Sequence, residues 1–323
     1  MVVRYSLEEQ NDMQREISKM FGVPEPLQKL NDVHEYEGVR FRGFVPAKSL
    51  EIIRDWETRD DDIFITTYPK SGTHWMWEIA LLVLAKGRAD DIDRTKMFGT
   101  GVEFLFPPEM TTPSHEIFAE MESPRVMITH LPWKFLPKQL TEGKKGRILY
   151  VMRNPKDTLA SLSRFILAPM GPVQDQRMWK FFFNMFLSGE MSHGSWFDHV
   201  HTYWTHREQE NVFFTSYEKL KLDFQSVARP LSKFLLGEEL DEDSLRRLEE
   251  NASMKGMKKS YDEIEKQRAD GVMITKAMGR SSFIQKGVIG SWKNVFSVAE
   301  NELFDEVCQE NMADWEFQPV YEG

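Results

Sequence analysis

Cysteine is almost absent from this chain, whose 323 residues include only one, Cys308. A single thiol excludes an internal disulfide framework and favours a reducing compartment. No apolar run approaches the ~18 uninterrupted residues of a membrane-spanning helix. Residues 1–20 are polar and charged, unlike a signal peptide. We therefore expect a cytoplasmic protein that does not work in a membrane.

An excess of basic charge is also missing. Lys and Arg together number 41 against 51 Asp and Glu, which gives a formal net charge of −10. General nucleic-acid binders carry a basic surface, so we expect no nucleic-acid partner. The same balance permits a small anionic ligand in a local basic pocket. The length suits one large α/β domain or two small ones.

Short apolar, β-branched segments alternate with longer segments of helix-forming residues. We expect strands at 63–67, 125–129, 147–152 and 212–215. We expect helices at 5–20, 48–56, 75–86, 159–166, 177–189, 196–210, 220–236, 241–252 and 298–312. The basic, glycine-punctuated region 255–286 has no clear period and is predicted to be a loop. Strands that alternate with helices indicate a parallel sheet covered by helices on both faces.

A strand, a tight turn and a helix start follow one another in residues 63–77, which read IFITTYPKSGTHWMW. Gly72 allows the backbone to turn tightly and to approach a ligand closely. Lys70, Ser71 and Thr73 add a cation and two hydroxyls to the N–H groups at the helix start, which predicts an anion-binding loop. The stretch does not match the G-x-x-x-x-G-K-[ST] loop of nucleotide-binding proteins. Taken alone, it also fits a plain turn.

Parallel sheets bind ligands at the carboxyl ends of their strands. The residues that follow the predicted strands are 68–73, His130, Arg153 and Tyr217. Cations suited to phosphates would therefore lie beside an imidazole that can move a proton near neutral pH.

Six segments resemble, in the same order along the chain, motifs of the cytosolic sulfotransferase family. They are TYPKSGTHW at 67–75, THLP at 129–132, YVMRNPKDTLAS at 150–161, GSWFDHV at 194–200, QKGVIGSWKN at 285–294 and KNVFSVAENE at 293–302. The resemblance covers about residues 45–317. It implies a single α/β domain with the P-loop-kinase-like sulfotransferase fold at 45–319, and an N-terminal extension at 1–44 packed on it.

The resemblance implies transfer of a sulfuryl group from 3′-phosphoadenosine 5′-phosphosulfate (PAPS) to a hydroxyl or an amine, with PAP as the second product. His130 would be the general base, Lys70 would neutralise charge on the leaving phosphate, and Ser161 would complete the catalytic set. The implied cofactor-binding residues are Lys70, Ser71, Gly72, Thr73, His74, Trp75, Arg153, Ser161, Tyr217, Ser253, Met254, Gln285, Lys286 and Gly287. No metal is expected, because a sulfuryl group carries less negative charge than a phosphoryl group.

Four positions depart from the family pattern. His74 stands where the family usually has Thr, and Ile128 stands where many members have Lys. Ala252 replaces a Thr or its equivalent on the adenine side, and Gln285 replaces the Arg before Lys-Gly. These departures concern the strength of PAPS binding more than the type of reaction.

An acceptor pocket is expected over His130, with Phe104 and Phe106 in its walls. The aromatic and methionine content of this region favours a small, largely apolar acceptor, such as a phenol, steroid, retinoid or aromatic amine. The segment 293–302 resembles the dimerisation stretch of the family and implies a homodimer, although it also reads as an ordinary turn and helix start. The implied dimer contacts are Lys293, Val298 and Glu302.

Two other functions remain open at this point. A PAP- or PAPS-binding protein with little catalysis would explain the departures, although Lys70, His130 and Ser161 are retained. A sulfated allylic alcohol can also eliminate, so the net reaction could be a dehydration. Acceptor-dependent formation of PAP separates an enzyme from a binding protein, and the mass of the product separates sulfation from dehydration.

Overall fold

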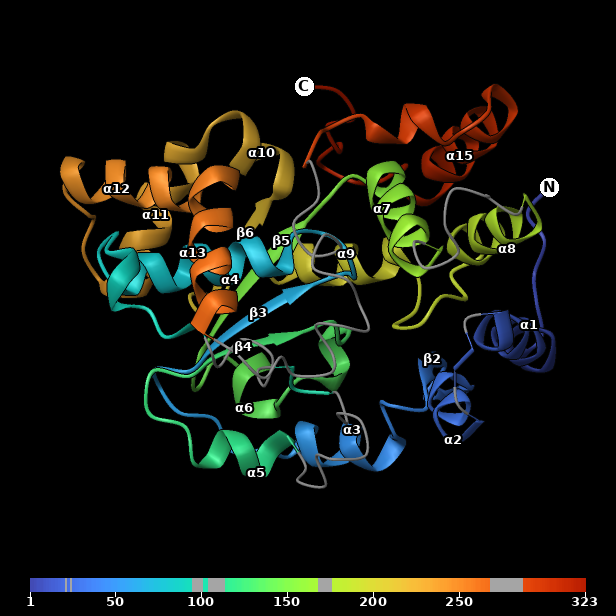
Figure 1. Ribbon diagram of the computed structural model, residues 1–323, viewed down its shortest axis with the longest axis horizontal. Helices are drawn as coiled ribbons and strands as arrows, with labels where there is room; N and C mark the ends of the chain where they lie inside the picture. The colour runs from blue at the N-terminus through green and yellow to red at the C-terminus, as the bar shows by residue number, and fades with distance from the viewer. Residues whose placement is uncertain (21, 24, 95–100, 104–113, 168–175, 268–286) are drawn as a thin grey trace.

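A four-stranded parallel sheet forms the centre of the computed structural model, which describes all residues except 21, 24, 95–100, 104–113, 168–175 and 268–286. The strands lie in the order β4 (Val126–Thr129), β3 (Ile63–Thr67), β5 (Arg147–Met152) and β6 (Val212–Ser216) (Figure 1). Ile63 pairs with both Val126 and Arg147, so β3 lies between β4 and β5. The four predicted strands are confirmed, and their ends differ from the prediction by one residue at most.

Helices cover both faces of this sheet, as the sequence predicted. One face carries α4 (Thr73–Leu84), α11 (Phe224–Leu236) and α12 (Glu242–Ala252), and the other carries α7 (Pro155–Leu167), α8 (Gln176–Leu187) and α9 (Trp196–Thr205). Side chains of β3 alternate between the two apolar cores, because successive residues of a strand point to opposite faces. Ile63 and Ile65 belong to the first core, and Phe64 belongs to the second.

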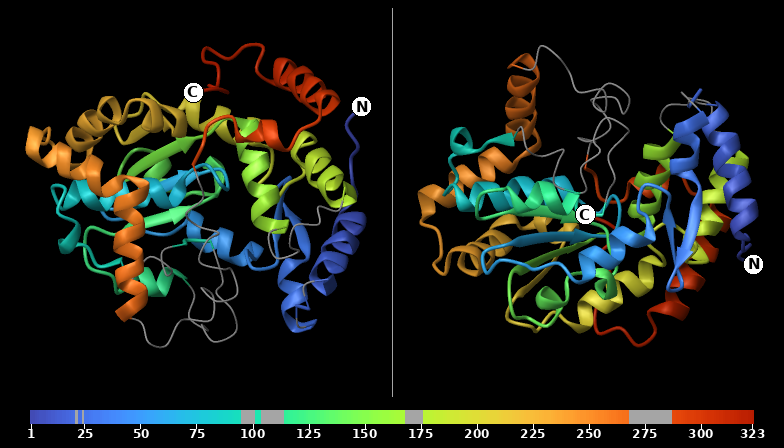
Figure 2. Two further views of the ribbon diagram at one scale, coloured as in Figure 1. Left: turned by 45° about the horizontal axis from the view of Figure 1, so that its top comes forward. Right: turned by 90° about the horizontal axis from the view of Figure 1, so that it is seen from below.

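The N-terminal part of the chain packs beside α8, at the opposite end of the molecule from α11 and α12 (Figure 2). The main-chain N–H of Val3 donates to Asn184 of α8 at 2.8 Å. Helix α1 (Leu7–Met20) begins with a capping pair, in which Glu9 N–H donates to Ser6 Oγ at 3.2 Å and Ser6 N–H donates to Glu9 at 2.8 Å. The antiparallel hairpin of β1 (Val33–Tyr36) and β2 (Val39–Arg42) follows.

Further helices and short turns complete the described fold. They are α2 (Glu25–Gln28), α3 (Ala47–Arg54), α5 (Ser114–Ala119), α6 (Lys138–Thr141), α10 (Tyr217–Leu222), α13 (Met254–Gln267), α15 (Val298–Asn311) and the 3₁₀ turns Lys29–Asn31, Ala89–Asp91, Trp133–Phe135 and Ser291–Asn294. Within the described residues, no helix is long and apolar enough to cross a bilayer.

Two predicted elements were wrong. The single helix expected at 220–236 is divided into α10 and α11 at Asp223, whose backbone leaves the helical region and whose carboxylate accepts the N–H of Ser226 at 3.2 Å. The region 255–286 was expected to be a loop, but its first part, up to Gln267, belongs to helix α13. Ser253 Oγ accepts the N–H of Gly256 at 3.0 Å at the start of this helix. Residues 268–286 lie outside the described part of the chain.

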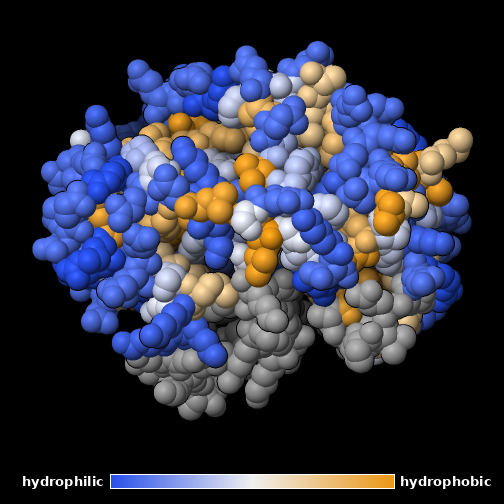
Figure 3. Space-filling view, turned by 90° about the horizontal axis from the view of Figure 1, so that it is seen from above, coloured by the Kyte–Doolittle hydropathy of each residue, from blue (hydrophilic) through white to orange (hydrophobic). Residues whose placement is uncertain are grey.

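The surface over α7, α10 and α15 is mostly hydrophilic at its margins, with apolar side chains gathered nearer its middle (Figure 3). Exposed apolar side chains of the described residues include Leu222, Met254, Val288, Val298 and Val320. Val298 is 76% exposed at the start of α15.

Candidate active site

The turn between β3 and α4 has the strained backbone that an anion-binding loop requires. Lys70 and Gly72 both adopt positive φ angles, of 70° and 103°. A side chain at position 72 would place Cβ 2.9 Å from the ring of Tyr217, so only glycine fits there. Among the described residues, the buried hydroxyl of Ser71 has no hydrogen-bond partner. Thr73 then begins α4, whose first N–H groups point into the turn.

Arg153 leaves the carboxyl end of β5 and points toward the same turn. Its guanidinium donates to the Lys70 carbonyl at 3.3 Å and lies 4.5 Å from the ring centre of Tyr217. Its Nε has no hydrogen-bond partner in the described part of the chain. Ser161 lies two turns along α7 and is buried, with 4% of its surface exposed. The buried hydroxyl of Ser71 and the buried Nε–H of Arg153, which have no partners among the described residues, suit an anionic group such as the phosphates of PAPS.

The segment after residue 286 is tied to α7 by one carboxylate. Asp157 accepts the main-chain N–H groups of Gly290 at 2.8 Å and Trp292 at 3.0 Å, and the hydroxyl of Ser291 at 2.9 Å. Arg164, one turn after Ser161, donates to the same hydroxyl at 2.9 Å. Because Arg153 and Ser161 flank Asp157 in the chain, this clamp places residues 287–292 beside the turn that carries Lys70.

Several residues predicted on the adenine side come together next to this loop. Trp75 Nε1 donates to the carbonyl of Ala252 at 2.8 Å, and its ring meets Tyr217 edge-on with centroids 5.3 Å apart. Ser253 is the next residue, and its hydroxyl donates to the main-chain carbonyl of Glu250 in α12 at 2.6 Å. Met254 is 40% exposed. Gly287 is described, whereas Gln285 and Lys286 lie outside the described residues, as do Phe104 and Phe106.

His130 follows the edge strand β4, and its hydrogen bonds define which ring nitrogen is basic. Nδ1 lies 2.9 Å from the carbonyl oxygen of Thr67. A carbonyl can only accept, so Nδ1 carries the proton and Nε2 is the unprotonated, basic nitrogen. Thr67 Oγ1 is 3.2 Å from the same nitrogen and 2.7 Å from Thr73 Oγ1, which links the imidazole to the first residue of α4.

Burial and mutual repulsion lower the pKa values of the cationic groups at this edge. Desolvation, and then the charge of Arg153, lower the pKa of Lys70 to about 8. Desolvation lowers the pKa of His130 to about 4 and that of His74 to about 3, and Lys70 contributes to both shifts. A bound anion would reverse these shifts, because negative charge favours the protonated forms. Ile128, which stands where many members of the family have Lys, lies in the apolar core.

Three residues of this region were missed by the sequence analysis. Glu103 Oε1 accepts the main-chain N–H of His130 at 2.8 Å. His199 Nε2 donates to the carbonyl of His130 at 3.1 Å, while its Nδ1 accepts the hydroxyl of Tyr150 at 2.9 Å. His193 meets the His130 ring at 75° with centroids 5.7 Å apart. For His199 the family-like segment GSWFDHV, which contains it, was a signal. Glu103 and His193 had none.

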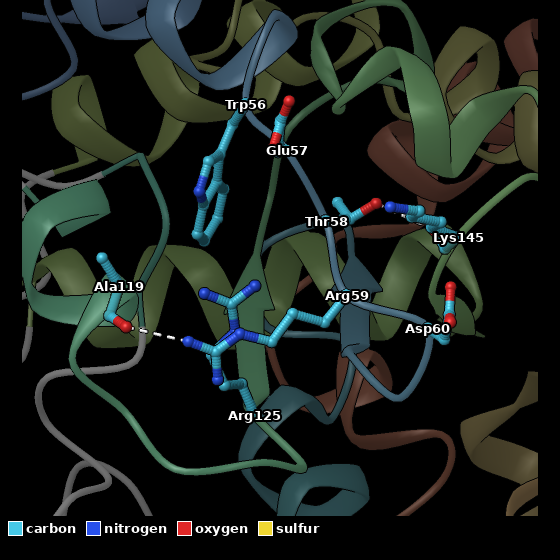
Figure 4. A pocket seen from close by; sticks show the side chains of 8 residues that line it. All are labelled: Trp56, Glu57, Thr58, Arg59, Asp60, Ala119, Arg125 and Lys145. Carbon is cyan, nitrogen blue, oxygen red and sulfur yellow. Dashed lines mark hydrogen bonds between the residues drawn. The ribbon is translucent and has the colours of Figure 1, made fainter.

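A separate depression, with a volume of about 480 Å³, lies at the opposite edge of the sheet (Figure 4). Its guanidinium groups are already occupied: Arg59 donates to Ala119 at 2.8 Å, and Arg125 donates to Asp62 at 2.6 Å. Trp56 lies 5.0 Å from the Arg125 guanidinium. Among the described residues, no group of three His, Cys, Asp or Glu is arranged to hold a metal.

Comparison with known proteins supports the resemblance seen in the sequence. The family described as "Sulfotransferase domain" matches residues 60–316. Human sulfotransferase 2A1 is 34% identical over 282 residues, covering 86% of this chain and 94% of that protein. The amine sulfotransferase of Oryctolagus cuniculus is 32% identical, covering 89% and 93%.

A solved structure agrees in fold. Mouse sulfotransferase SULT7A1 complexed with PAP superimposes with a TM-score of 0.67 at 27% identity, covering 88% of this chain and 95% of that one. The family match, the relatives and the fold lead to one conclusion: this chain belongs to the sulfotransferase family and is a sulfotransferase.

Proposed function

We propose that this enzyme transfers a sulfuryl group from PAPS to a hydroxyl or an amine of a small, largely apolar acceptor. The observation that carries the proposal is the bond between His130 Nδ1 and the Thr67 carbonyl, at 2.9 Å. It holds the imidazole with Nε2 unprotonated, at the carboxyl edge that also carries Lys70 and Arg153. The base and the anion-binding groups are thus next to one another.

When bound, PAPS supplies a sulfuryl group attached to a phosphate that can leave. Lys70 and the N–H groups of Gly72 and Thr73 would stabilise negative charge on that phosphate. Arg153 and Ser161 would bind the 3′-phosphate, together with Lys286 and Gly287. Ser71 Oγ and Arg153 Nε, which lack partners among the described residues, support this assignment. The cofactor site would be completed by His74, Trp75, Tyr217, Ser253, Met254 and Gln285.

His130 Nε2 would take the proton of the acceptor as its oxygen or nitrogen attacks sulfur. Its lowered pKa, about 4, leaves the ring neutral and ready to accept a proton across the physiological range. An amine acceptor is supported by the relative named amine sulfotransferase. Apolar walls are supported by the aromatic core beside the site, where Tyr68 contacts Phe186 edge-on with centroids 5.9 Å apart. Phe104 and Phe106 are proposed to contribute to these walls.

We also propose a division of the chain into an extension at 1–44 and the catalytic domain at 45–319. Contacts such as the ion pair of Arg40 with Glu190, at 3.6 Å, support packing of the extension on the domain. A homodimer through Lys293, Val298 and Glu302 is proposed from the family-like segment. The single cysteine supports action in the cytoplasm.

The test begins with calorimetric titration of PAP into the purified protein in metal-free buffer. We expect one site per chain, followed by turnover of at least one phenol, steroid, retinoid or aromatic amine with PAPS. Mass spectrometry of the product identifies a sulfate ester or sulfamate. Absence of PAP binding, or binding without turnover of any acceptor, would contradict the proposed reaction.

A further inference from the structure

A buried carboxylate lies directly behind the base. The segment before Glu103 runs along the edge strand β4, where Gly101 forms a parallel bridge with Ile128 and Val102 N–H donates to the Ile128 carbonyl at 3.0 Å. In a continued parallel ladder, a main-chain carbonyl would accept the next N–H, which belongs to His130. Glu103 Oε1 accepts it instead, at 2.8 Å. A carboxyl group that can ionise therefore lies where a sheet normally places a neutral carbonyl.

A second imidazole faces this carboxylate. His193 Nε2 is 3.8 Å from Glu103 Oε1, and the two side chains are 5% and 0% exposed. The backbone of His193 has a φ angle of 74°, uncommon for a residue other than glycine, and its N–H donates to Arg40 at 2.8 Å. Among the described residues, the two ring nitrogens of His193 have no hydrogen-bond partner. Glu103 Oε2 has none either.

The chemistry of the base creates a charge that this carboxylate can balance. His130 becomes an imidazolium when it takes a proton, and its Nδ1–H then still points to the neutral carbonyl of Thr67. A buried cation without a negative partner is strongly destabilised. The Glu103 carboxyl group is hydrogen-bonded to the main chain of His130. Among the described residues, the other titratable or charged groups that act on Glu103 or on the imidazoles beside it include Arg42, Lys70, His74, His199 and Tyr203. When charged, four of them are cations, which would only add positive charge, and Tyr203 is a neutral phenol.

We propose that Glu103 is a positioning residue for His130: its carboxylate fixes the main chain of the base and, when ionised, balances the imidazolium that forms during transfer. In that step, the acceptor O–H or N–H bond breaks and its proton moves to His130 Nε2. The freed electron pair forms the new bond to sulfur, and the leaving phosphate keeps the pair of the old S–O bond. The inference rests on the proposed function, since that reaction supplies the proton.

The pKa of the carboxylate gives the inference a signature. Desolvation raises the pKa of Glu103 to about 7, although the hydrogen bonds from His130 and Thr129 act in the opposite direction. The ionised fraction of Glu103 therefore increases as pH rises through neutrality, and His130 becomes the stronger base in the same range. Below this range Glu103 is neutral and its charge cannot help.

The variant Glu103→Gln separates charge from geometry, because its amide oxygen can still accept the N–H of His130. We expect the ratio of wild-type to variant kcat to be near one at pH 5.5 and to rise to about tenfold at pH 8.5, with KM values unchanged. A ratio that does not depend on pH would overturn the inference. If Glu103→Gln does not fold, Glu103→Asp is the alternative, because it keeps the charge at a greater distance from His130. Its kcat should still increase with pH through neutrality, to a lower maximum than in the wild type. An Asp variant whose kcat does not increase would equally overturn the inference.

A second measurement needs neither donor nor acceptor. Long-range ¹H–¹⁵N spectra resolve the ring nitrogens of the eight histidines, and the signals lost in His130→Asn identify those of the base. We expect the Nδ1–H tautomer in both proteins. The His130 ring signals of the wild type should shift as Glu103 ionises near pH 7, and this shift should be absent in Glu103→Gln. The matched control is Glu218→Gln, which removes another buried carboxylate whose pKa is raised to about 7, at the donor side; it should leave the shift of the His130 signals unchanged.

The same shift of the His130 signals near pH 7 in wild type and Glu103→Gln would overturn the inference, as would loss of that shift in the Glu218→Gln control. Failure of the proposed function would be visible separately, as absent PAP binding or turnover in the wild type. The ring titration would still decide what Glu103 does to His130 in that case.

Discussion

The two edges of the central sheet contain similar groups and treat them differently. At the amino edge, the Arg125 guanidinium donates to Asp62 at 2.6 Å and to the Phe118 carbonyl at 2.8 Å, which satisfies a fully buried cation. At the carboxyl edge, Ser71 Oγ, Arg153 Nε and Glu103 Oε2 have no hydrogen-bond partner among the described residues.

This difference separates structural charges from functional ones. Buried polar groups are normally paired, because an unpaired one loses its hydration without compensation. At the amino edge the buried guanidinium of Arg125 follows that rule, and both guanidinium groups of the depression are paired within the protein (Figure 4). The carboxyl edge departs from it where the proposed donor and acceptor bind. Removing a charge should therefore reduce stability at one edge and binding or turnover at the other.

The largest effect is expected from loss of the base. His130→Ala should lower kcat by about 10³-fold, because general-base catalysis by a positioned side chain contributes about 10²–10⁴-fold. Binding of PAP should change by less than about threefold, since His130 is assigned to the acceptor. Steady-state kinetics and calorimetry measure the two effects. A variant that keeps wild-type turnover would refute the assignment.

At the amino edge, Arg125→Met should reduce the free energy of unfolding by about 3–5 kcal/mol, because it leaves the Asp62 carboxylate buried without its partner. Urea titration at pH 7 measures this. Arg59→Met is the matched control: Arg59 donates only to main-chain carbonyls and one serine hydroxyl, so its loss should amount to about 1 kcal/mol. The folded fraction of either variant should bind PAP normally; weakened binding would contradict the division between edges.

At the carboxyl edge, Arg153→Met should weaken PAP binding by about 30-fold, since a charge-assisted hydrogen bond to phosphate contributes about 2 kcal/mol. Stability should change by less than in Arg125→Met, because no partner carboxylate is left behind. Calorimetry and urea titration of both variants test the contrast directly. Equal losses of stability in the two proteins would remove it.

The clamp on residues 287–292 should have a smaller effect. Asp157→Asn weakens the hydrogen bonds to Gly290, Ser291 and Trp292, so the segment is held less firmly. We expect PAP affinity to fall by about tenfold. Ser291→Ala removes one of these bonds and should reduce affinity by about threefold. Unchanged affinity in both variants would show that the clamp does not serve the donor site.

The smallest expected effect is the uptake of protons when PAP binds. The pKa of Lys70 in the free protein is about 8, below the ordinary value near 10.5 of an unfolded chain, so folding stability should rise with pH between these values. PAP favours the charged amine, so binding at pH 8 should take up about half a proton, and affinity should fall as pH rises further. Calorimetry in buffers of different ionisation enthalpy measures this uptake. It should vanish in Lys70→Met; persistence there would assign it to another group.

Local signals were sufficient for much of this molecule. The β-branched runs at 63–67 and 147–152 predicted strands with the observed bounds, and the strand–turn–helix pattern around Gly72 predicted a cradle for an anion. His130 could be singled out because it follows a predicted strand and matches a family motif. Such features depend on neighbours in the chain, so sequence is enough to recognise them.

Other features depend on residues that are distant in sequence. The division of α10 from α11 depends on Asp223 acting as a cap, and helix α13 begins where Ser253 caps it; propensity alone did not distinguish these from a longer helix and a loop. Glu103 and His193 acquire their relation to His130 only through folding, across 27 residues in the case of the Glu103 hydrogen bond.

The sequence by itself determined the parallel sheet, because the sheet follows from side-chain period. It also predicted the anion loop, from backbone freedom and residue type, and His130 as the base, from its place after a strand and the family resemblance. Only the tertiary structure decided which ring nitrogen of His130 is basic and which buried charges are left unpaired. The physical reason is that hydrogen-bond partners and desolvation are properties of the packed chain.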